Sequence, residues 1–362
     1  MIITQYTYET KGNCDMSDIS KIDKNFKIES TVERAGVEFF NIDEAPFKIY
    51  GVYRENGIYR RMPEEVAKSV SEGVYGLHWH TAGGRVRFVT DSKFISINAS
   101  LNNLGKMPHF PLTGSIGFDM YNGDTYVKTF VPPFDIEDGY ESSFEFAESE
   151  KRCITINFPL YSGVTELYIG LDGGSLLEEA PEYANEKPIV YYGSSITQGG
   201  CASRPGTIYQ AIISRHFNYD YINLGFSGSA KGEDEIIDYI KNLDMSMFVC
   251  DYDHNAPSVE HLKATHEKMF KAVRAVHPDI PIILMSRPQY RQIKEVKERR
   301  AVVESTYQNA LASGDKNVYF IDGVALTELC GNDGTVDTCH PTDYGFASMA
   351  QAVIKVMKDI KI

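Results

Sequence analysis

The hydrophobic pattern of this chain changes near residue 180, and this change constrains the fold more than any other feature of the sequence. Before it, short runs alternate between apolar and polar residues, the period of strands with one buried face. After it, short apolar runs alternate with stretches of helical period. A chain of 362 residues also exceeds one typical core. We therefore predict two domains of different class, residues 1–180 and residues 181–362.

The first domain is predicted to be antiparallel. Its alternating runs lie at residues 85–88, 144–146, 154–158 and 167–171. Turn-rich segments at residues 81–84, 121–124 and 172–174 separate these runs and are typical of hairpins. The pattern predicts an antiparallel β-sandwich, jelly-roll-like, over about residues 20–175.

The second domain is predicted to be an α/β domain with a parallel sheet. Its strand candidates lie at residues 188–193, 220–225, 245–251, 280–286 and 317–322. We expect one helix to begin at Pro257, another to run from Arg291 to Gly314, and the helix after the first strand to begin only near Pro205. Right-handed crossovers place such helices on both faces of the sheet. Because ligands bind at the carboxyl ends of parallel strands, the residues that follow each strand are the candidates for a site.

Polar residues and glycines follow several of these strands. Ser195 follows the first strand, where a strand-to-helix turn would project its hydroxyl into a cleft. Gly228 follows the second strand and Asn255 the third, and a close backbone approach and an amide donor are what an oxyanion hole needs. Before the last helix, Asp337 precedes His340 by three residues, a spacing that can hold the imidazole in one tautomer.

These blocks, in this order, resemble the SGNH superfamily of GDSL-type hydrolases. Residues 193–197 stand in place of the family's Gly-Asp-Ser, with Ser194 replacing the usual Asp, and the third block reads Asp-His-Asn instead of Gly-x-Asn-Asp. The resemblance implies a flavodoxin-like parallel five-stranded SGNH hydrolase domain. It also implies that no metal or organic cofactor is needed.

The roles that the resemblance carries over are those of a catalytic triad. Ser195 would be the nucleophile, His340 the general base and acid, and Asp337 the residue that orients the imidazole. The oxyanion donors would be the backbone N–H groups of Ser195 and Gly228 and the side chain of Asn255.

With the segments at residues 107–114 and 158–163, the first half of the chain resembles the β-rich N-terminal domain of two-domain carbohydrate acetylesterases. The expected function is therefore a serine ester hydrolase that acts through an acyl-enzyme and removes O-acetyl groups from a carbohydrate. A lipase-like or thioester acyl hydrolase is the alternative enzyme, and a carbohydrate-binding protein with a degenerate hydrolase domain is the non-enzyme alternative. Because the linker at residues 176–187 is short, we expect the N-terminal domain to pack against the hydrolase domain and to line part of its cleft.

Other residues could carry different chemistry. Asp251 and His254 repeat the Asp-x-x-His spacing, and we favour the later pair over them. His78 and His80 would face one side of a strand and could ligate a metal, although we favour a packing role. Cys250 and Cys339 lie near the expected site, but neither has a visible base that would make it a thiolate nucleophile.

The charge and the apolar content limit the expected partners. A net charge of −14 disfavours nucleic acid and anionic membranes. No apolar run is long enough for a membrane helix, and the first thirty residues do not resemble a secretory signal. The six cysteines suggest free thiols in the cytoplasm, unless a signal peptide has been removed. We expect a small-molecule or oligosaccharide ester as the partner, and homo-oligomers stay open.

Overall fold

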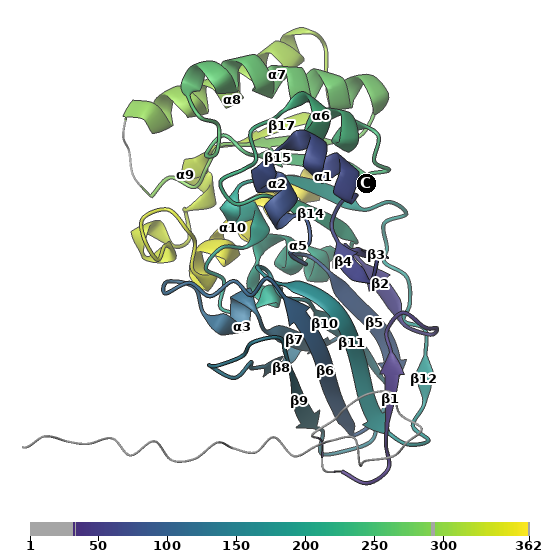
Figure 1. Cartoon of the computed structure of the whole chain (residues 1–362). Coiled ribbons are helices and arrows are strands. Elements are labelled where there is room, and N and C mark those ends of the chain that lie inside the picture. The colour runs from purple at the N-terminus through teal and green to yellow at the C-terminus, as the bar shows by residue number, and fades with distance from the viewer. Residues whose placement is uncertain (1–31, 33, 291–293, 361–362) are drawn as a thin grey trace, which may run out of the picture.

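A computed structural model describes residues 32, 34–290 and 294–360, and it contains an antiparallel β-sandwich below an α/β domain (Figure 1). The predicted fold class is thereby confirmed. The expected start of the sandwich near residue 20 and Arg291, the expected start of a helix, lie outside the described residues.

Two antiparallel sheets form the sandwich. One has the strand order β1-β11-β6-β9, and the other has the order β12-β5-β10-β7-β8 with β2 also paired to β5. The strands are β1 (Val37–Asn41), β2 (Lys48–Tyr50), β5 (Arg85–Thr90), β6 (Phe94–Asn102), β7 (Phe118–Asn122), β8 (Thr125–Phe130), β9 (Gly139–Glu145), β10 (Arg152–Asn157), β11 (Gly163–Asp172) and β12 (Leu177–Glu178). Side chains of both sheets, such as Ile97 and Ile169 from one and Phe88 and Ile154 from the other, share one buried core.

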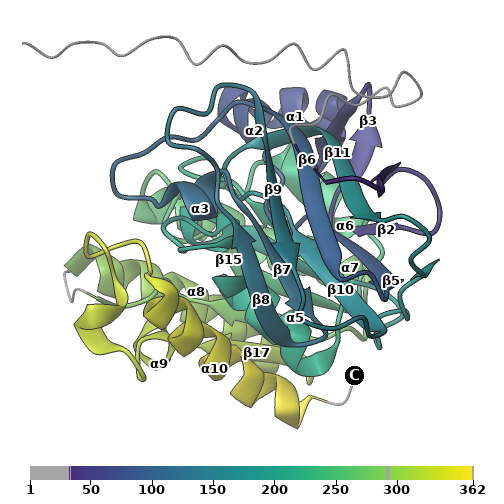
Figure 2. The same cartoon turned by 90° about the horizontal axis from the view of Figure 1, so that it is seen from below.

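Strand β5 differs from the prediction, because all six of its residues are buried and not only one face. Val86 and Phe88 point into the sandwich core. On the other face, the guanidinium of Arg85 donates to the backbone oxygen of Tyr221 and pairs with Asp220 in the α/β domain. The second domain therefore covers the outer face of this sheet, as the view from below also indicates (Figure 2).

One of the three predicted hairpin turns is confirmed. Residues 121–124 connect β7 to β8, and Gly123 adopts φ 59°, a value that favours glycine. Residues 81–84 instead lead from a helix into β5, and residues 172–174 carry the chain from one sheet to the other. Turn chemistry marks these positions correctly, but it does not specify which strands the turn connects.

The first domain also contains elements that the alternation did not predict. These are the hairpin β3 (Tyr53–Glu55) and β4 (Ile58–Arg60) and the short helices α1 (Glu64–Val70), α2 (Glu72–Leu77) and α3 (Leu112–Ser115). Met62, Ala67, Val70 and Val74 are buried in a core that belongs mainly to the α/β domain. Helix α1 lies beside α6 of that domain (Figure 1), so residues 62–74 contribute to its helical layer.

The α/β domain is built on five parallel strands in the order β14-β13-β15-β16-β17, which is the flavodoxin-like order. The strands are β13 (Ile189–Gly193), β14 (Tyr221–Gly225), β15 (Met247–Asp251), β16 (Ile282–Met285) and β17 (Val318–Ile321). The helices are α4 (Ser195–Gln198), α5 (Tyr209–Phe217), α6 (Asp234–Lys241), α7 (Val259–Val276), α8 (Lys294–Ala312), α9 (Gly323–Leu326) and α10 (Asp343–Asp359), with 3₁₀ turns η2 (Pro205–Thr207) and η3 (Gly331–Gly334). All five strand predictions are confirmed, each within a few residues at its ends.

Both faces of the parallel sheet are covered, as predicted. Along β13, Ile189 and Tyr191 enter the core shared with α5 and α10, whereas Val190 and Tyr192 enter the core shared with α6, α7 and α8. This double burial holds the carboxyl ends of the central strands in a fixed place. No helix among the described residues is long and apolar enough to cross a membrane.

Candidate active site

The candidate site begins at the carboxyl ends of three adjacent strands. Gly193, the last residue of β13, is in register with Gly225 of β14 on one side and Asp251 of β15 on the other. The segments that carry Ser195, Gly228 and Asn255 leave the sheet directly after these three residues. Their placement at one edge is the arrangement that the sequence predicted.

Ser195 is the first residue of α4, a single-turn helix. The hydroxyl of Ser194 accepts a hydrogen bond from the amide of Ile196, and Gly199 ends the helix with φ 107°. The prediction that no helix begins before Pro205 is therefore wrong, because one turn is too short to produce a hydrophobic period. Gly193 is required before this turn, since a Cβ there would lie 2.2 Å from the backbone oxygen of Asp251.

Ser195, His340 and Asp337 form a continuous hydrogen-bonded chain. The Ser195 hydroxyl lies 2.9 Å from His340 Nε2, and His340 Nδ1 lies 2.7 Å from Asp337 Oδ2. Ser195 is only 5% exposed, whereas the Asp337 side chain is 38% exposed. Each ring nitrogen of His340 thus has one partner, and the imidazole is oriented between the serine and the carboxylate.

The loop that carries Asp337 is arranged to keep its carboxylate ionised. Asp337 Oδ1 accepts hydrogen bonds from the amides of Cys339 at 3.0 Å and of His340 at 2.7 Å, and Thr338 between them adopts φ 70°. Burial alone would raise the pKa of Asp337, but the bonds from His340 and Cys339 outweigh it and lower the pKa to about 2. The carboxylate is therefore negative at any pH at which an esterase works.

The three expected oxyanion donors differ in their surroundings. The amide of Ser195 is the first in α4 and so has no partner within that helix. Gly228 is exposed with φ 69°, and we find no hydrogen bond of its amide in the described part of the chain. The donor of the Asn255 side chain is its Nδ2 group, for which we find no hydrogen bond among the described residues, and the neighbouring Oδ1, an acceptor, is buried without a partner there. Donors that are not already engaged are the kind that an oxyanion hole uses.

Helix α4, which carries Ser195, is contacted by residues of the sandwich domain. The sequence did not identify these residues. The Tyr161 hydroxyl donates to the backbone oxygen of Ser195 at 3.2 Å. The side-chain nitrogen of Gln198, at the end of α4, lies 3.1 Å from His80 Nδ1 and donates to the backbone oxygen of Leu160. His80 and Tyr161 are separated from Ser195 by long stretches of chain, so no local pattern could have related them.

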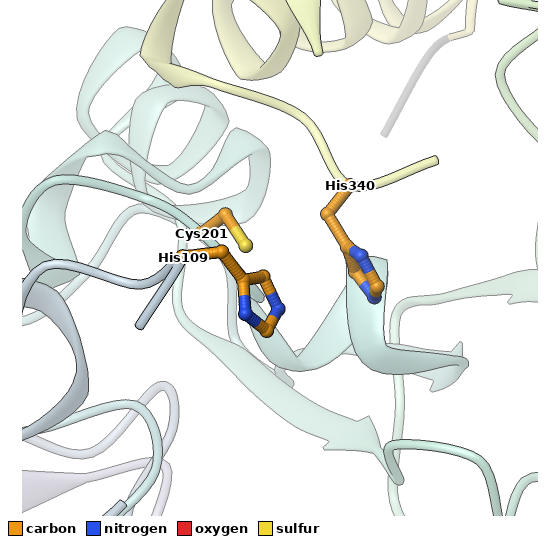
Figure 3. Close-up of side chains that lie close together, drawn as sticks. All are labelled: His109, Cys201 and His340. Atoms are coloured by element: carbon orange, nitrogen blue, oxygen red, sulfur yellow. The ribbon is translucent and has the colours of Figure 1, made fainter. Parts of the chain in front are cut away.

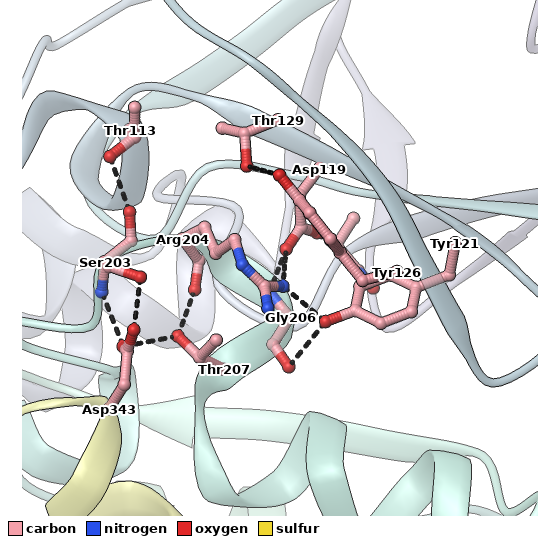
Figure 4. A network of polar contacts seen from close by, with 11 residues as sticks. Thr113, Asp119, Tyr121, Tyr126, Thr129, Ser203, Arg204, Gly206, Thr207 and Asp343 are labelled. Carbon is pink, nitrogen blue, oxygen red and sulfur yellow. Dashed lines mark hydrogen bonds and ion pairs between the residues drawn. The ribbon is translucent and has the colours of Figure 1, made fainter.

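A polar network joins the two domains beside the site (Figure 4). The Asp119 carboxylate, on β7, pairs with Arg204 at 2.9 Å and accepts the amide of Gly206 at 2.8 Å. Asp343, at the start of α10, accepts the amide of Ser203 at 2.8 Å and the hydroxyl of Thr207 at 2.7 Å. The segment between α4 and α5 is thus bound on one side to the sandwich and on the other to the helix that follows His340.

The competing pair, Asp251 and His254, does not assemble. Asp251 is buried and accepts the Thr197 hydroxyl at 3.2 Å, and no contact between Asp251 and His254 is found in the described residues. His254 Nε2 instead lies 3.1 Å from the sulfur of Cys339. Cys339 therefore has an imidazole neighbour, contrary to our expectation. However, burial raises the pKa of Cys339 and lowers that of His254 to about 3, so both groups are held neutral.

The alternative in which His78 and His80 ligate a metal, which we did not favour, is also not supported. His78 and His80 do not lie on a strand but follow α2, and His78 contacts Arg60 and the backbone oxygen of Tyr75. The two imidazoles therefore have separate partners. The difference arises because the alternating His-Trp-His pattern also occurs where a helix ends in a turn.

A different cluster in the described residues has ligand atoms within 4.8 Å of one another, namely His109, Cys201 and His340 (Figure 3). The ring centroids of His109 and His340 are 5.9 Å apart. Both nitrogens of His340 are already occupied by Ser195 and Asp337, and burial raises the pKa of Cys201 to about 12. A metal here would displace Ser195 from His340, so we interpret His109 as a residue that the sandwich domain places beside His340.

Comparisons with known proteins agree with this geometry. Residues 186–358 match the GDSL-like lipase/acylhydrolase family, and residues 37–177 match the N-terminus of the SGNH hydrolase-type esterases. The chain belongs to the GDSL-like SGNH hydrolases. No curated protein matches it significantly.

Solved structures extend the likeness of this SGNH hydrolase over both domains. A putative GDSL-like lipase from Bacteroides ovatus is 25% identical with a TM-score of 0.78, over 89% of this chain and 98% of that one. The salicylyl-acyltransferase SsfX3 from a tetracycline biosynthetic pathway is 19% identical with a TM-score of 0.73, over 90% and 98%. A family two carbohydrate esterase from Clostridium thermocellum, in complex with cellohexaose, is 16% identical with a TM-score of 0.58, over 77% and 92%. The last two similarities concern the fold alone.

Proposed function

We propose that this SGNH hydrolase is a serine ester hydrolase that acts through an acyl-enzyme and removes O-acetyl groups from a carbohydrate. The observation that carries the proposal is the hydrogen-bonded chain from the Ser195 hydroxyl through His340 to Asp337. A hydroxyl bonded to an imidazole that is itself bonded to a carboxylate is the arrangement that activates a serine.

The reaction would proceed in two halves. In the first, the Ser195 oxygen attacks the ester carbonyl, His340 takes the hydroxyl proton and then gives it to the departing alcohol. In the second, His340 takes a proton from water, the resulting hydroxide attacks the acyl-serine, and the proton returns to Ser195 as acetate leaves. The amides of Ser195 and Gly228 and the Asn255 side chain would stabilise the negative oxygen of both tetrahedral intermediates.

Two observations support a carbohydrate substrate. The similar Clostridium thermocellum fold is that of a carbohydrate esterase with bound cellohexaose. In addition, His109 brings the sandwich domain to the edge of His340, so a substrate larger than a simple ester would touch both domains. An acetylated oligosaccharide is such a substrate.

We also propose a cytoplasmic location. The five cysteines in the described residues are free, which supports this proposal.

A lipase-like function is favoured by one specific observation. Val336, beside Asp337, is 43% exposed, and Leu329 and Tyr344 in the same part of the chain are 46% and 47% exposed. These side chains could receive a longer acyl chain. The SsfX3 fold adds acyl transfer to an alcohol as a second fate of the acyl-enzyme.

Turnover of nitrophenyl esters of increasing chain length, followed by mass spectrometry on acetylated oligosaccharides, tests the proposal. We expect acetate esters to be the best substrates and Ser195→Ala and His340→Ala to lower kcat/KM by more than about a thousandfold. His254→Ala is the matched control, because it removes a neighbouring imidazole that does not contact Ser195.

Three results would contradict the proposal. Activity above about a tenth of wild type in folded Ser195→Ala would exclude Ser195 as the nucleophile, since loss of the nucleophile lowers the rate by orders of magnitude. A preference for long acyl chains would favour the lipase-like alternative. Transfer to an added alcohol in preference to water would make the protein an acyltransferase.

A further inference from the structure

A cavity of about 190 Å³ lies between the two domains and is built from neither one alone. The outer face of the sandwich provides Arg85, Arg87 and Tyr121, and the α/β domain provides Arg215 and Tyr221. None of its lining residues belongs to the Ser195, His340 and Asp337 site. Three arginines in one small cavity are unusual in a chain whose net charge is −14.

Each of the three guanidinium nitrogens of Arg85 donates a hydrogen bond to another group of the protein. Its guanidinium pairs with Asp220 and donates to the backbone oxygen of Gly83 at 2.7 Å and to the hydroxyl of Tyr183 at 2.8 Å. It therefore fixes the wall of the cavity and needs no ligand.

The guanidinium of Arg87 lacks such partners among the described residues. It is only 6% exposed, and its Nε and Nη1 have no hydrogen-bond partner among the described residues. Its Nη2 reaches only the sulfur of Cys153 at 3.9 Å, and its guanidinium lies 4.1 Å from the centre of the Tyr183 ring. A buried cation without a counterion is strongly destabilising, so N–H groups left free in a cavity point to an absent anionic partner.

Neighbouring acids do not fill that role. Glu182 is exposed and accepts hydrogen bonds from Lys48 and Tyr50. These bonds lower the pKa of Glu182, and the charge of Arg87 adds only a smaller effect. Asp124, the carboxylate that lines the cavity within the described residues, is exposed and accepts the hydroxyl of Thr125.

Arg215 adds a second positive charge from the opposite wall. Its guanidinium stacks 4.1 Å from the centre of the Tyr121 ring, and it makes no ion pair within the described part of the chain. Two arginines facing one space can hold an oxyanion through several charge-assisted hydrogen bonds. The volume equals that of about six water molecules, which suits a phosphate or a small carboxylate and excludes an oligosaccharide.

We propose that this interdomain cavity binds a small oxyanion, a phosphate or carboxylate group, held by Arg87 and Arg215. The ligand would join the two domains, because one arginine comes from each. This site is independent of the ester hydrolysis proposed above.

Thermal unfolding at constant ionic strength, with inorganic phosphate, glucose 6-phosphate, glucuronate or sodium chloride, tests the proposal. A ligand at about a hundred times its Kd should raise the midpoint by roughly 3 °C or more in a saturable manner, and sodium chloride should not. The two phosphates and glucuronate distinguish a free inorganic ion from the acidic group of a sugar.

Variants identify the residues. Without anion, Arg87→Met should unfold at or above the wild-type temperature, because a buried unpaired charge is removed, yet it should lose the anion response. Arg215→Gln, at a half-buried position, should fold and also lose most of the response. Arg152→Met removes a buried arginine of the same sheet that lies outside the cavity, and its anion response should stay.

Two results would overturn the proposal. One is the absence of a saturable shift in the wild type with any of the three anions. The other is an equal shift in the wild type, Arg87→Met and Arg215→Gln, which would place the anion elsewhere.

Discussion

Removal of the sandwich domain should prevent the hydrolase domain from folding. The proposed domain boundary lies near residue 180, and a fragment of residues 181–362 retains Ser195, Asp337 and His340. However, apolar side chains from the first domain complete both cores of the second. The large ones are Met62, Val70, Val74, Phe110, Leu160 and Tyr161.

The size of the effect follows from these contacts. Each of the six side chains is at most 9% exposed, and burying one contributes about 2 kcal/mol. Their removal costs about 12 kcal/mol, which is as large as the whole stability of a typical domain, about 5 to 15 kcal/mol. The fragment would also expose the apolar surface that these residues cover.

Two measurements check this prediction. The fragment should be insoluble or should unfold without a cooperative transition in urea, as followed by circular dichroism. In the full chain, Leu160→Ala should cost about 2 to 5 kcal/mol, whereas Phe134→Ala, at a position 90% exposed, should cost almost nothing. A soluble fragment with a cooperative transition and wild-type activity would refute the reasoning, because the sandwich would then be an independent module.

Two further predictions concern the site and the core. Tyr161→Phe removes the hydrogen bond to the backbone oxygen of Ser195. In steady-state kinetics it should lower kcat about fivefold and leave the KM for a small ester unchanged. A change in KM alone would contradict a positioning role for Tyr161. Burial lowers the pKa of His266 to about 4, whereas a histidine in an unfolded chain titrates near about 6.5. The folded state therefore binds fewer protons between these values, and the stability that is complete above about pH 6.5 is lost as the pH falls to about 4. In the wild type, the free energy of unfolding should therefore fall with pH by roughly 3 kcal/mol more than in His266→Gln. If the urea midpoint changed equally in the variant and the wild type between pH 7 and pH 4, this prediction would be wrong.

The α/β domain was predictable because its signals are local and repeated. Each buried strand is a short apolar run, and the residues after the strands are close in sequence to the runs that position them. For this reason the placement of Ser195, Gly228 and Asn255 at one edge followed from the chain order alone. The choice of His340 over His254 followed only from the family resemblance, since both spacings are equal, and it is the geometry that separates them.

The contributions of the sandwich to the site were not predictable in this way. His80 and His109 lie in turns and loops with no period, and each meets its partner across more than a hundred residues. Helices α1 and α2 were not predicted, because their buried residues pack into the core of the other domain. The alternating pattern of the surrounding strands does not indicate such a contact.

The position of Ser195, the proposed nucleophile, depends on these distant contacts for a physical reason. Helix α4 has four residues, far fewer than an isolated helix needs for stability. Its geometry must therefore come from its surroundings, and they include both domains. The Thr197 backbone oxygen accepts the Asn223 side chain at 2.7 Å from within the α/β domain, while Tyr161 and His80 contact the two ends of the helix from the sandwich. Ser195, which lies 2.9 Å from His340 Nε2, is thus held between two domains, and the sandwich contributes to the candidate site whether or not it touches the proposed substrate.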